Sequence, residues 1–173
     1  IICPNFSKLS DDFPKFIKDM SSLKKFLIRL SINEGELTNI ANGLEKLAKL
    51  EDLELNFKKL YDYEVHEMFH VNSYDGSSLG VALANLTNLR SLKLTFPKFE
   101  VCPTGFFEGI SKGVGVLSSL LILNITITGT GITASKIENL FKQIRGLSTL
   151  EEFRASLSLD EIQKAEFIML INH

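Results

Sequence analysis

The sequence contains no tryptophan and only two cysteines, Cys3 and Cys102, among its 173 residues. Two cysteines cannot build a disulfide scaffold, so we expect a reducing compartment and a cytoplasmic location. Basic residues are not in excess, because 19 lysines and arginines stand against 21 acidic residues for a net charge of −2. This balance argues against a nucleic-acid or membrane-surface binder. The hydrophobic content of 45% excludes a disordered chain and suffices for the core of one domain.

Charge is missing altogether from one stretch of the chain. Between Lys112 and Lys136 lie 23 uncharged residues, long enough in principle to span a bilayer. The stretch contains serine, threonine and asparagine, and its apolar residues alternate with polar ones from Leu121 onward. A membrane helix is more often continuously apolar, so we interpret the stretch as part of a folded core. Residues 1–15 also lack the basic and apolar regions of a signal peptide, and we expect no membrane partner.

An eight-residue pattern, L-x-x-[LF]-x-[LIA]-x-[FIL], occurs five times, starting at Leu23, Leu50, Leu89, Leu120 and Leu150. Its alternation predicts a strand with one buried face. Apolar residues also recur three, six and ten positions before each start, which predicts the apolar stripe of a helix. Each segment is therefore expected to form a helix, a short turn and a strand. Neither element can bury its apolar side without neighbouring copies, so the segments must stack.

This pattern resembles the leucine-rich repeat family in its longer, helix-bearing form, as in ribonuclease inhibitor and many protist proteins. The resemblance covers roughly residues 10–170. It implies an α/β leucine-rich repeat solenoid, with a curved parallel sheet on the concave side and helices on the convex side. The family's usual asparagine at the ninth position is replaced here by Ser31, Lys58, Pro97, Thr128 and Ser158.

We interpret residues 1–173 as a single domain of about five repeats. Residues 159–173 follow the last predicted strand and are expected to form the helix of a sixth unit. Because both ends of the pattern are incomplete, we expect the chain to belong to a longer array, with further repeats or subunits packed on either end.

The residues between the buried strand positions are expected to point outward from the sheet. The resemblance implies that this concave face binds a protein partner. Its mixed charge with a few apolar side chains suits a protein surface better than a phosphate backbone. The candidate binding residues are Lys25, Leu27, Arg29, Asp52, Glu54, Asn56, Ser91, Lys93, Thr95, Ile122, Asn124, Thr126, Glu152, Arg154 and Ser156.

Two other surfaces are candidates as well. The insertion that lengthens one repeat, around Tyr61–Ser78, is rich in aromatic residues, which either anchor an interface or pack on the helices. The two ends of the array would leave strand and helix edges without neighbours.

The string His66-Glu67-Met68-Phe69-His70 matches H-E-x-x-H, in which two histidines on one helix face bind zinc and the glutamate activates a water molecule. A zinc-dependent hydrolase is therefore an alternative function. The string falls in the insertion, which is too short to add the sheet and third ligand of such an enzyme. We interpret it as coincidental and expect no metal, no cofactor and no catalytic residue.

The glycines between Gly109 and Gly115, and the string Gly129-Thr130-Gly131, do not match the phosphate loop of nucleotide-binding proteins. We expect Gly113 to allow close packing of a helix on the sheet. The expected function is a non-catalytic protein–protein interaction or scaffold module, with a purely architectural subunit of a large assembly as a further alternative.

Overall fold

The structure of the chain, a computed structural model, describes residues 2–3, 17, 19–31, 34–58, 76–96, 104–128 and 133–158. The strands are β1 (Ile2–Cys3), β2 (Lys25–Ser31), β3 (Asp52–Lys58), β4 (Ser91–Phe96), β5 (Ile122–Thr128) and β6 (Glu152–Ser158). The helices are α2 (Glu34–Leu44), α3 (Ser77–Ala84), α4 (Thr104–Val114) and α5 (Ala134–Arg145). All five predicted strands are present, each beginning two residues after the first leucine of its pattern. The H-E-x-x-H string and residues 159–173 lie outside the described ranges.

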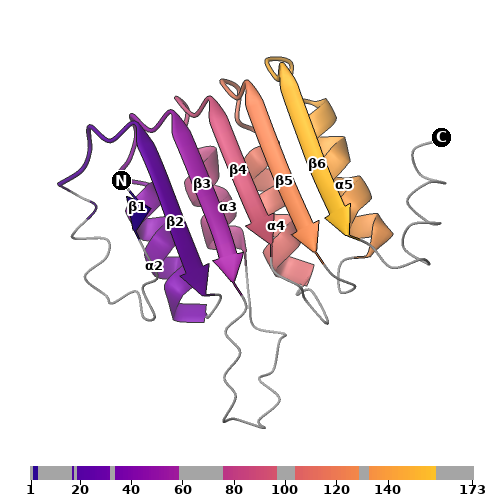
Figure 1. Cartoon of the computed structure of the whole chain (residues 1–173), viewed down its shortest axis with the longest axis horizontal. Helices are drawn as coiled ribbons and strands as arrows, with labels where there is room; N and C mark the ends of the chain where they lie inside the picture. Colours follow the sequence, from indigo (N-terminus) through magenta and orange to yellow (C-terminus); the bar gives the residue numbers. More distant parts are fainter. Residues whose placement is uncertain are drawn as a thin grey trace, which may run out of the picture.

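The strands form one parallel sheet in which their order, β1-β2-β3-β4-β5-β6, is their order along the chain. The helices of the described ranges lie on one face of this sheet, and none of them lies on the other face (Figure 1). Equivalent positions of the pattern pair directly, since Lys25 pairs with Asp52, Asp52 with Ser91, Ser91 with Ile122, and Ile122 with Glu152. The α/β class with a parallel sheet is thereby confirmed. Strand β1 was not predicted, because two residues are too short to form an alternating pattern.

The core lies between the sheet and the helices. Along β4 and β5 every second side chain is buried and the residues between them are exposed or half-buried. The predicted helix stripe is buried too, at Ile40, Leu44, Leu79, Leu83, Ile110, Val114, Leu140 and Ile144. Each such side chain contributes about 1.5–3 kcal/mol through burial. Sheet and helices therefore stabilise each other, as the paired strand and helix patterns require.

Aromatic rings close the core near the carboxyl ends of β3 and β4. The rings of Phe57 and Phe96 stack with centroids 5.6 Å apart and an interplanar angle of 15°. Phe106 of α4 meets both rings edge-on, at centroid distances of 5.6 and 6.0 Å. Such pairs add about 0.5–1.5 kcal/mol each to the effect of burial. They fix the position of α4 relative to these two strands.

The predicted helices are about one turn too long at their carboxyl ends. Helix α2 ends at Leu44, and Leu47, the next apolar residue of the stripe, lies in the turn that follows. There the amide of Leu47 donates to the carbonyl of Leu44 at 2.9 Å, and the amide of Leu50 donates to that of Leu47 at 2.9 Å. These bonds between residues three apart tighten the turn and keep the leucine in the core. The same bonds recur at Leu86, Leu117 and Leu147.

Backbone hydrogen bonds also join successive units, a unit being one helix, its turn and the strand that follows. The carbonyl of Lys24 accepts bonds from the amides of Glu51 and Asp52, at 2.8 and 2.9 Å. We call this arrangement, in which one carbonyl accepts two successive amides of the next unit, the carbonyl series. Its other members are the carbonyls of Glu51, Arg90 and Leu121, which accept from Arg90 and Ser91, Leu121 and Ile122, and Glu151 and Glu152.

Helices α3 and α4 approach each other through glycines. A β-carbon on Gly80 would lie 2.0 Å from the carbonyl oxygen of Gly109, and one on Gly113 would lie 2.2 Å from that of Gly80. Only glycine permits backbones this close. The prediction that Gly113 serves helix-on-sheet packing is wrong, because its close neighbour is the adjacent helix.

The described part of the uncharged stretch, residues 113–128 and 133–135, belongs to several helices and strands. It includes the end of α4, a turn, β5 and the first residues of α5, and β5 lies between β4 and β6 in the sheet. Leu123, Ile125 and Ile127 of β5 are buried in the core. Within the described ranges, no helix is long and apolar enough to cross a membrane.

Candidate functional site

The fifteen candidate residues lie together on the sheet face opposite the described helices, which we call the open face. None of them is buried, whereas their neighbours along β3, β4 and β5 are. The strand register arranges them in three rows that cross the sheet. These rows are Lys25-Asp52-Ser91-Ile122-Glu152, Leu27-Glu54-Lys93-Asn124-Arg154 and Arg29-Asn56-Thr95-Thr126-Ser156.

Most charges on the open face are paired with one another. The ammonium group of Lys25 lies 3.2 Å from a carboxylate oxygen of Asp52 on the next strand. Lys93 lies 3.0 Å from Glu54, again between neighbouring strands. Such exposed pairs contribute roughly 0–1 kcal/mol each to stability. Their larger effect is on the surface potential, since each cation is compensated locally.

The arginine residues of the open face lie on β2 and β6. Arg154 of β6 lies 2.7 Å from Glu152, two residues earlier on the same strand. Arg29 of β2 is exposed and, within the described part of the chain, has no carboxylate in ion-pair distance. Among the described side chains of the face, Arg29 is therefore a cation without local compensation.

Beside the Glu54–Lys93 pair, the open face carries a group of uncharged polar side chains towards the carboxyl ends of its strands. Asn56 of β3, Thr95 of β4, and Asn124 and Thr126 of β5 form this uncharged patch, and all four are half-buried. Neighbouring strands are about 4.8 Å apart, so these amides and hydroxyls form a continuous patch of hydrogen-bonding groups. A ligand here would meet donors and acceptors rather than net charge.

A further ion pair lies just before the strands begin. Lys24 donates a hydrogen bond to the carboxylate of Glu51 at 2.7 Å. This bond, together with the positive charges of Lys24, Arg90 and Lys25, holds the pKa of Glu51 below its ordinary value, although desolvation acts in the opposite direction. Opposite charges are therefore paired beside the open face, at Lys24 and Glu51, as they are within it.

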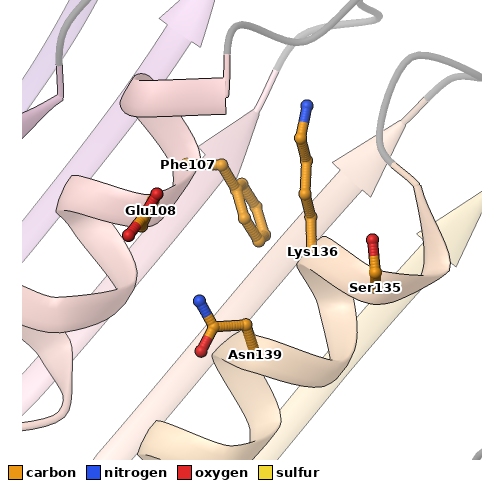
Figure 2. Close-up of a pocket in the computed structure, with 5 residues that line it drawn as sticks. All are labelled: Phe107, Glu108, Ser135, Lys136 and Asn139. Atoms are coloured by element: carbon orange, nitrogen blue, oxygen red, sulfur yellow. The ribbon is translucent and has the colours of Figure 1, made fainter.

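The helical side carries a shallow hollow of about 140 Å³ between α4 and α5. Figure 2 shows it lined by Phe107 and Glu108 of α4 and by Ser135, Lys136 and Asn139 of α5. Glu108 is engaged by Lys112 at 2.9 Å, one helical turn away. Pockets for small-molecule ligands usually enclose about 300–1,000 Å³, so this hollow is too small to be a binding site of that kind.

Metal-ligating residues do not gather in the described part of the chain. No three of its histidines, cysteines, aspartates and glutamates are placed to hold a metal ion. His66 and His70 lie outside that part, as does most of the insertion; its last residues, Ser77 and Ser78, begin α3.

The cross-strand ion pairs were missed by sequence reasoning, which treated each charged residue of the face separately. Their signal was present, because Lys25 and Asp52 occupy the same position of successive patterns, and so do Glu54 and Lys93. Aligning charges as well as leucines identifies both pairs.

The chain matches no family model, no curated protein and no solved structure.

Proposed function

We propose that the chain is a non-catalytic protein-interaction module, built as a leucine-rich repeat solenoid with the open face as its concave binding surface. Three observations support this architecture. The strands follow chain order, equivalent positions of the pattern pair in register, and the helices lie on one face. In this proposal the chain is one domain of a longer array and its partner is a protein.

The observation that carries the proposal is the composition of the open face. Its uncharged patch of Asn56, Thr95, Asn124 and Thr126 offers amides and hydroxyls, which complement the backbone and polar side chains of another protein. A nucleic-acid surface instead needs several uncompensated cations for the phosphates. Here Lys25, Lys93 and Arg154 are each paired with a carboxylate. This pattern favours a protein partner over a nucleic acid.

The rigidity of the face supports recognition by a preformed surface. Its strands are held from behind by a buried core and linked by the carbonyl series. A preformed surface loses little conformational entropy on binding, which leaves more of the contact energy for affinity. The half-buried Asn124 and Thr126 belong to the uncharged patch of this surface and are the residues on which we expect binding to depend most.

A pair of arginine variants tests the proposal. Thr126→Arg places a bulky cation in the uncharged patch of the open face, and Val81→Arg places the same side chain on α3, where Val81 is 56% exposed on the helical side. Proteins captured by the wild-type chain are identified, purified and titrated against all three chains. We expect Thr126→Arg to weaken binding at least about tenfold, which is 1.4 kcal/mol, and Val81→Arg to leave it unchanged.

Alanine variants at Glu54, Lys93 and Arg154 extend the test to the charged positions of the face. A partner that binds Thr126→Arg as tightly as wild type does not use the open face. If every direct partner behaved in this way, the proposal would be wrong. If Thr126→Arg left binding unchanged and Val81→Arg weakened it, the binding surface would lie on the helical side.

A further inference from the structure

The three rows of the open face differ in the charges that they carry. Acidic side chains occur only in the first two rows, where Asp52, Glu54 and Glu152 each lie in an ion pair. The third row, which we call the Arg29 row, consists of Arg29, Asn56, Thr95, Thr126 and Ser156. Of the three, it lies nearest the carboxyl ends of the strands, and it combines one cation with four uncharged polar side chains. An anionic group of a partner is therefore best accommodated at this row.

The uncharged side chains of the Arg29 row are available to a ligand. Asn56, Thr95 and Thr126 are half-buried, and within the described part of the chain their side chains make no hydrogen bond. Thr128, two residues beyond Thr126, shows the alternative, because its hydroxyl donates to the carbonyl of Phe96 at 3.1 Å. Side chains that are already partly shielded from water lose less hydration when a ligand covers them. Hydrogen bonds with a partner are therefore favourable along this row.

Arg29 provides the charged end of the row. Its side chain is exposed, and the described residues place no carboxylate within ion-pair distance of it. Glu54, two residues before Asn56, is engaged by Lys93 of β4, on the side of β3 away from β2. A guanidinium donates two parallel hydrogen bonds to a carboxylate in a planar fork. Asn56, opposite Arg29 in the register, adds an amide on the next strand, about 4.8 Å away, so the two side chains together suit one carboxylate.

We propose that the protein partner places an acidic side chain, aspartate or glutamate, against Arg29 and Asn56 and lays an uncharged polar segment along Thr95 and Thr126. This inference rests on the proposed protein-binding function of the open face. A single uncompensated cation complements one carboxylate, whereas a chain of phosphates needs several cations. With strands about 4.8 Å apart, the row from β2 to β5 is about 14 Å long, which about five residues of extended peptide cover.

Short random peptides displayed on phage through their carboxyl ends provide the probe, since side chains then supply their only carboxylates. The library is selected in parallel on the wild-type chain, on Arg29→Glu and on Arg145→Glu, a matched change at the exposed end of α5 on the helical side. We expect wild type and Arg145→Glu to enrich peptides with aspartate or glutamate at one fixed position, and Arg29→Glu to enrich lysine or arginine there. A selected acidic peptide, synthesised with an amidated carboxyl end, should bind Arg29→Glu at least about tenfold more weakly than wild type.

The inference is overturned if the wild-type chain enriches no peptide, if the enriched peptides lack a preferred acidic position, or if that preference persists in Arg29→Glu. Thr126→Trp, which obstructs the row without adding charge, separates this failure from that of the proposed function. Peptides that bind Arg29→Glu like wild type but are lost in Thr126→Trp still occupy the open face, so only the acidic contact is wrong. Peptides that bind Thr126→Trp like wild type lie elsewhere, which contradicts the proposed function too. Should Arg29→Glu fail to fold, Arg29→Gln removes the same charge and supports the same comparison.

Discussion

Gly80 of α3 and Gly109 of α4 lie so close together that a β-carbon on Gly80 would stand 2.0 Å from the carbonyl oxygen of Gly109. The atom in the way belongs to the backbone, which cannot move without displacing the whole helix. Both glycines are therefore part of the helix–helix interface, although each weakens its own helix by about 1 kcal/mol relative to alanine.

We expect Gly80→Ala to lower the free energy of unfolding by about 1–3 kcal/mol or more, the usual range for overpacking. Urea unfolding followed by circular dichroism measures the change. Gly146→Ala is the control, because the nearest atom to a β-carbon there is 3.3 Å away and the residue has φ −76°. A Gly80→Ala chain as stable as wild type would show that the two helices can separate at little cost.

Asn88, Thr128 and Thr149 link successive units by bonding to a backbone carbonyl of the preceding unit. Asn88 donates to the carbonyl of Ala48 at 2.8 Å, and Thr149 donates to that of Ser118 at 3.0 Å. We expect Asn88→Ala to cost about 0.5–1.5 kcal/mol, the usual net value of one hydrogen bond. Lys49→Ala is the matched control, since Lys49 precedes Leu50 as Asn88 precedes Leu89. Equal unfolding curves for the two variants would contradict the role of the Asn88 bond.

The pairing of Glu54 with Lys93 predicts a reciprocal effect of charge reversal. Glu54→Lys places two ammonium groups opposite each other on neighbouring strands, which should destabilise the chain. Adding Lys93→Glu restores opposite charges and should recover about 0.2–1 kcal/mol of coupling energy. A double-mutant cycle at low and high salt measures this energy, which we expect to fall as salt rises. Strict additivity of the two changes would contradict the pairing.

The lowered pKa of Glu51 predicts a pH effect of definite sign. The carboxylate form is favoured in the folded chain, so it adds stability above the ordinary value of 4.5, and that contribution is lost as pH falls through the folded pKa. Carboxyl resonances followed by NMR should show Glu51 titrating below 4.5 in the wild type and closer to 4.5 in Lys24→Ala. Lys112→Ala, which removes the partner of Glu108, should leave the titration of Glu51 where it is.

The H-E-x-x-H string allows a separate test of the zinc-hydrolase alternative. It lies between β3 and α3, within residues 59–76, a segment too short to add the further elements of a zinc hydrolase. We expect the purified and dialysed protein to contain much less than one zinc per chain by elemental analysis. One zinc per chain that is lost in His66→Ala would favour the hydrolase instead.

The strands and the buried stripe could be predicted because each depends on a short-range pattern. Alternation from Leu53 to Phe57 defines a strand with one buried face whatever its neighbours are, and the register follows once the patterns are aligned. The same alternation placed the candidate residues on one face. The end of α2 was misplaced by three residues because Leu47 stays in the core whether the chain there is a helix or a tight turn.

Other features depend on how two elements meet, and no single segment contains that information. The contact between Gly80 and Gly109 depends on how close the two helices lie, and the periodicity of the sequence contains no information on that distance. The exposure of Phe153 follows from its position on the last strand of the described sheet, since its pattern is the same as that of the buried strands. In both cases the residue type was visible in the sequence and the neighbour was not.

The carbonyl series has a consequence for how the chain transmits energetic effects. Each of its carbonyls, from Lys24 to Leu121, bonds only to the unit that comes next. The coupling is thus one-dimensional, and a disturbance can reach a distant strand only by passing through every strand between them. Changes in β2 and β6 should therefore act independently of each other. Substitutions at one end of the sheet can then be tolerated without compensating substitutions at the other end.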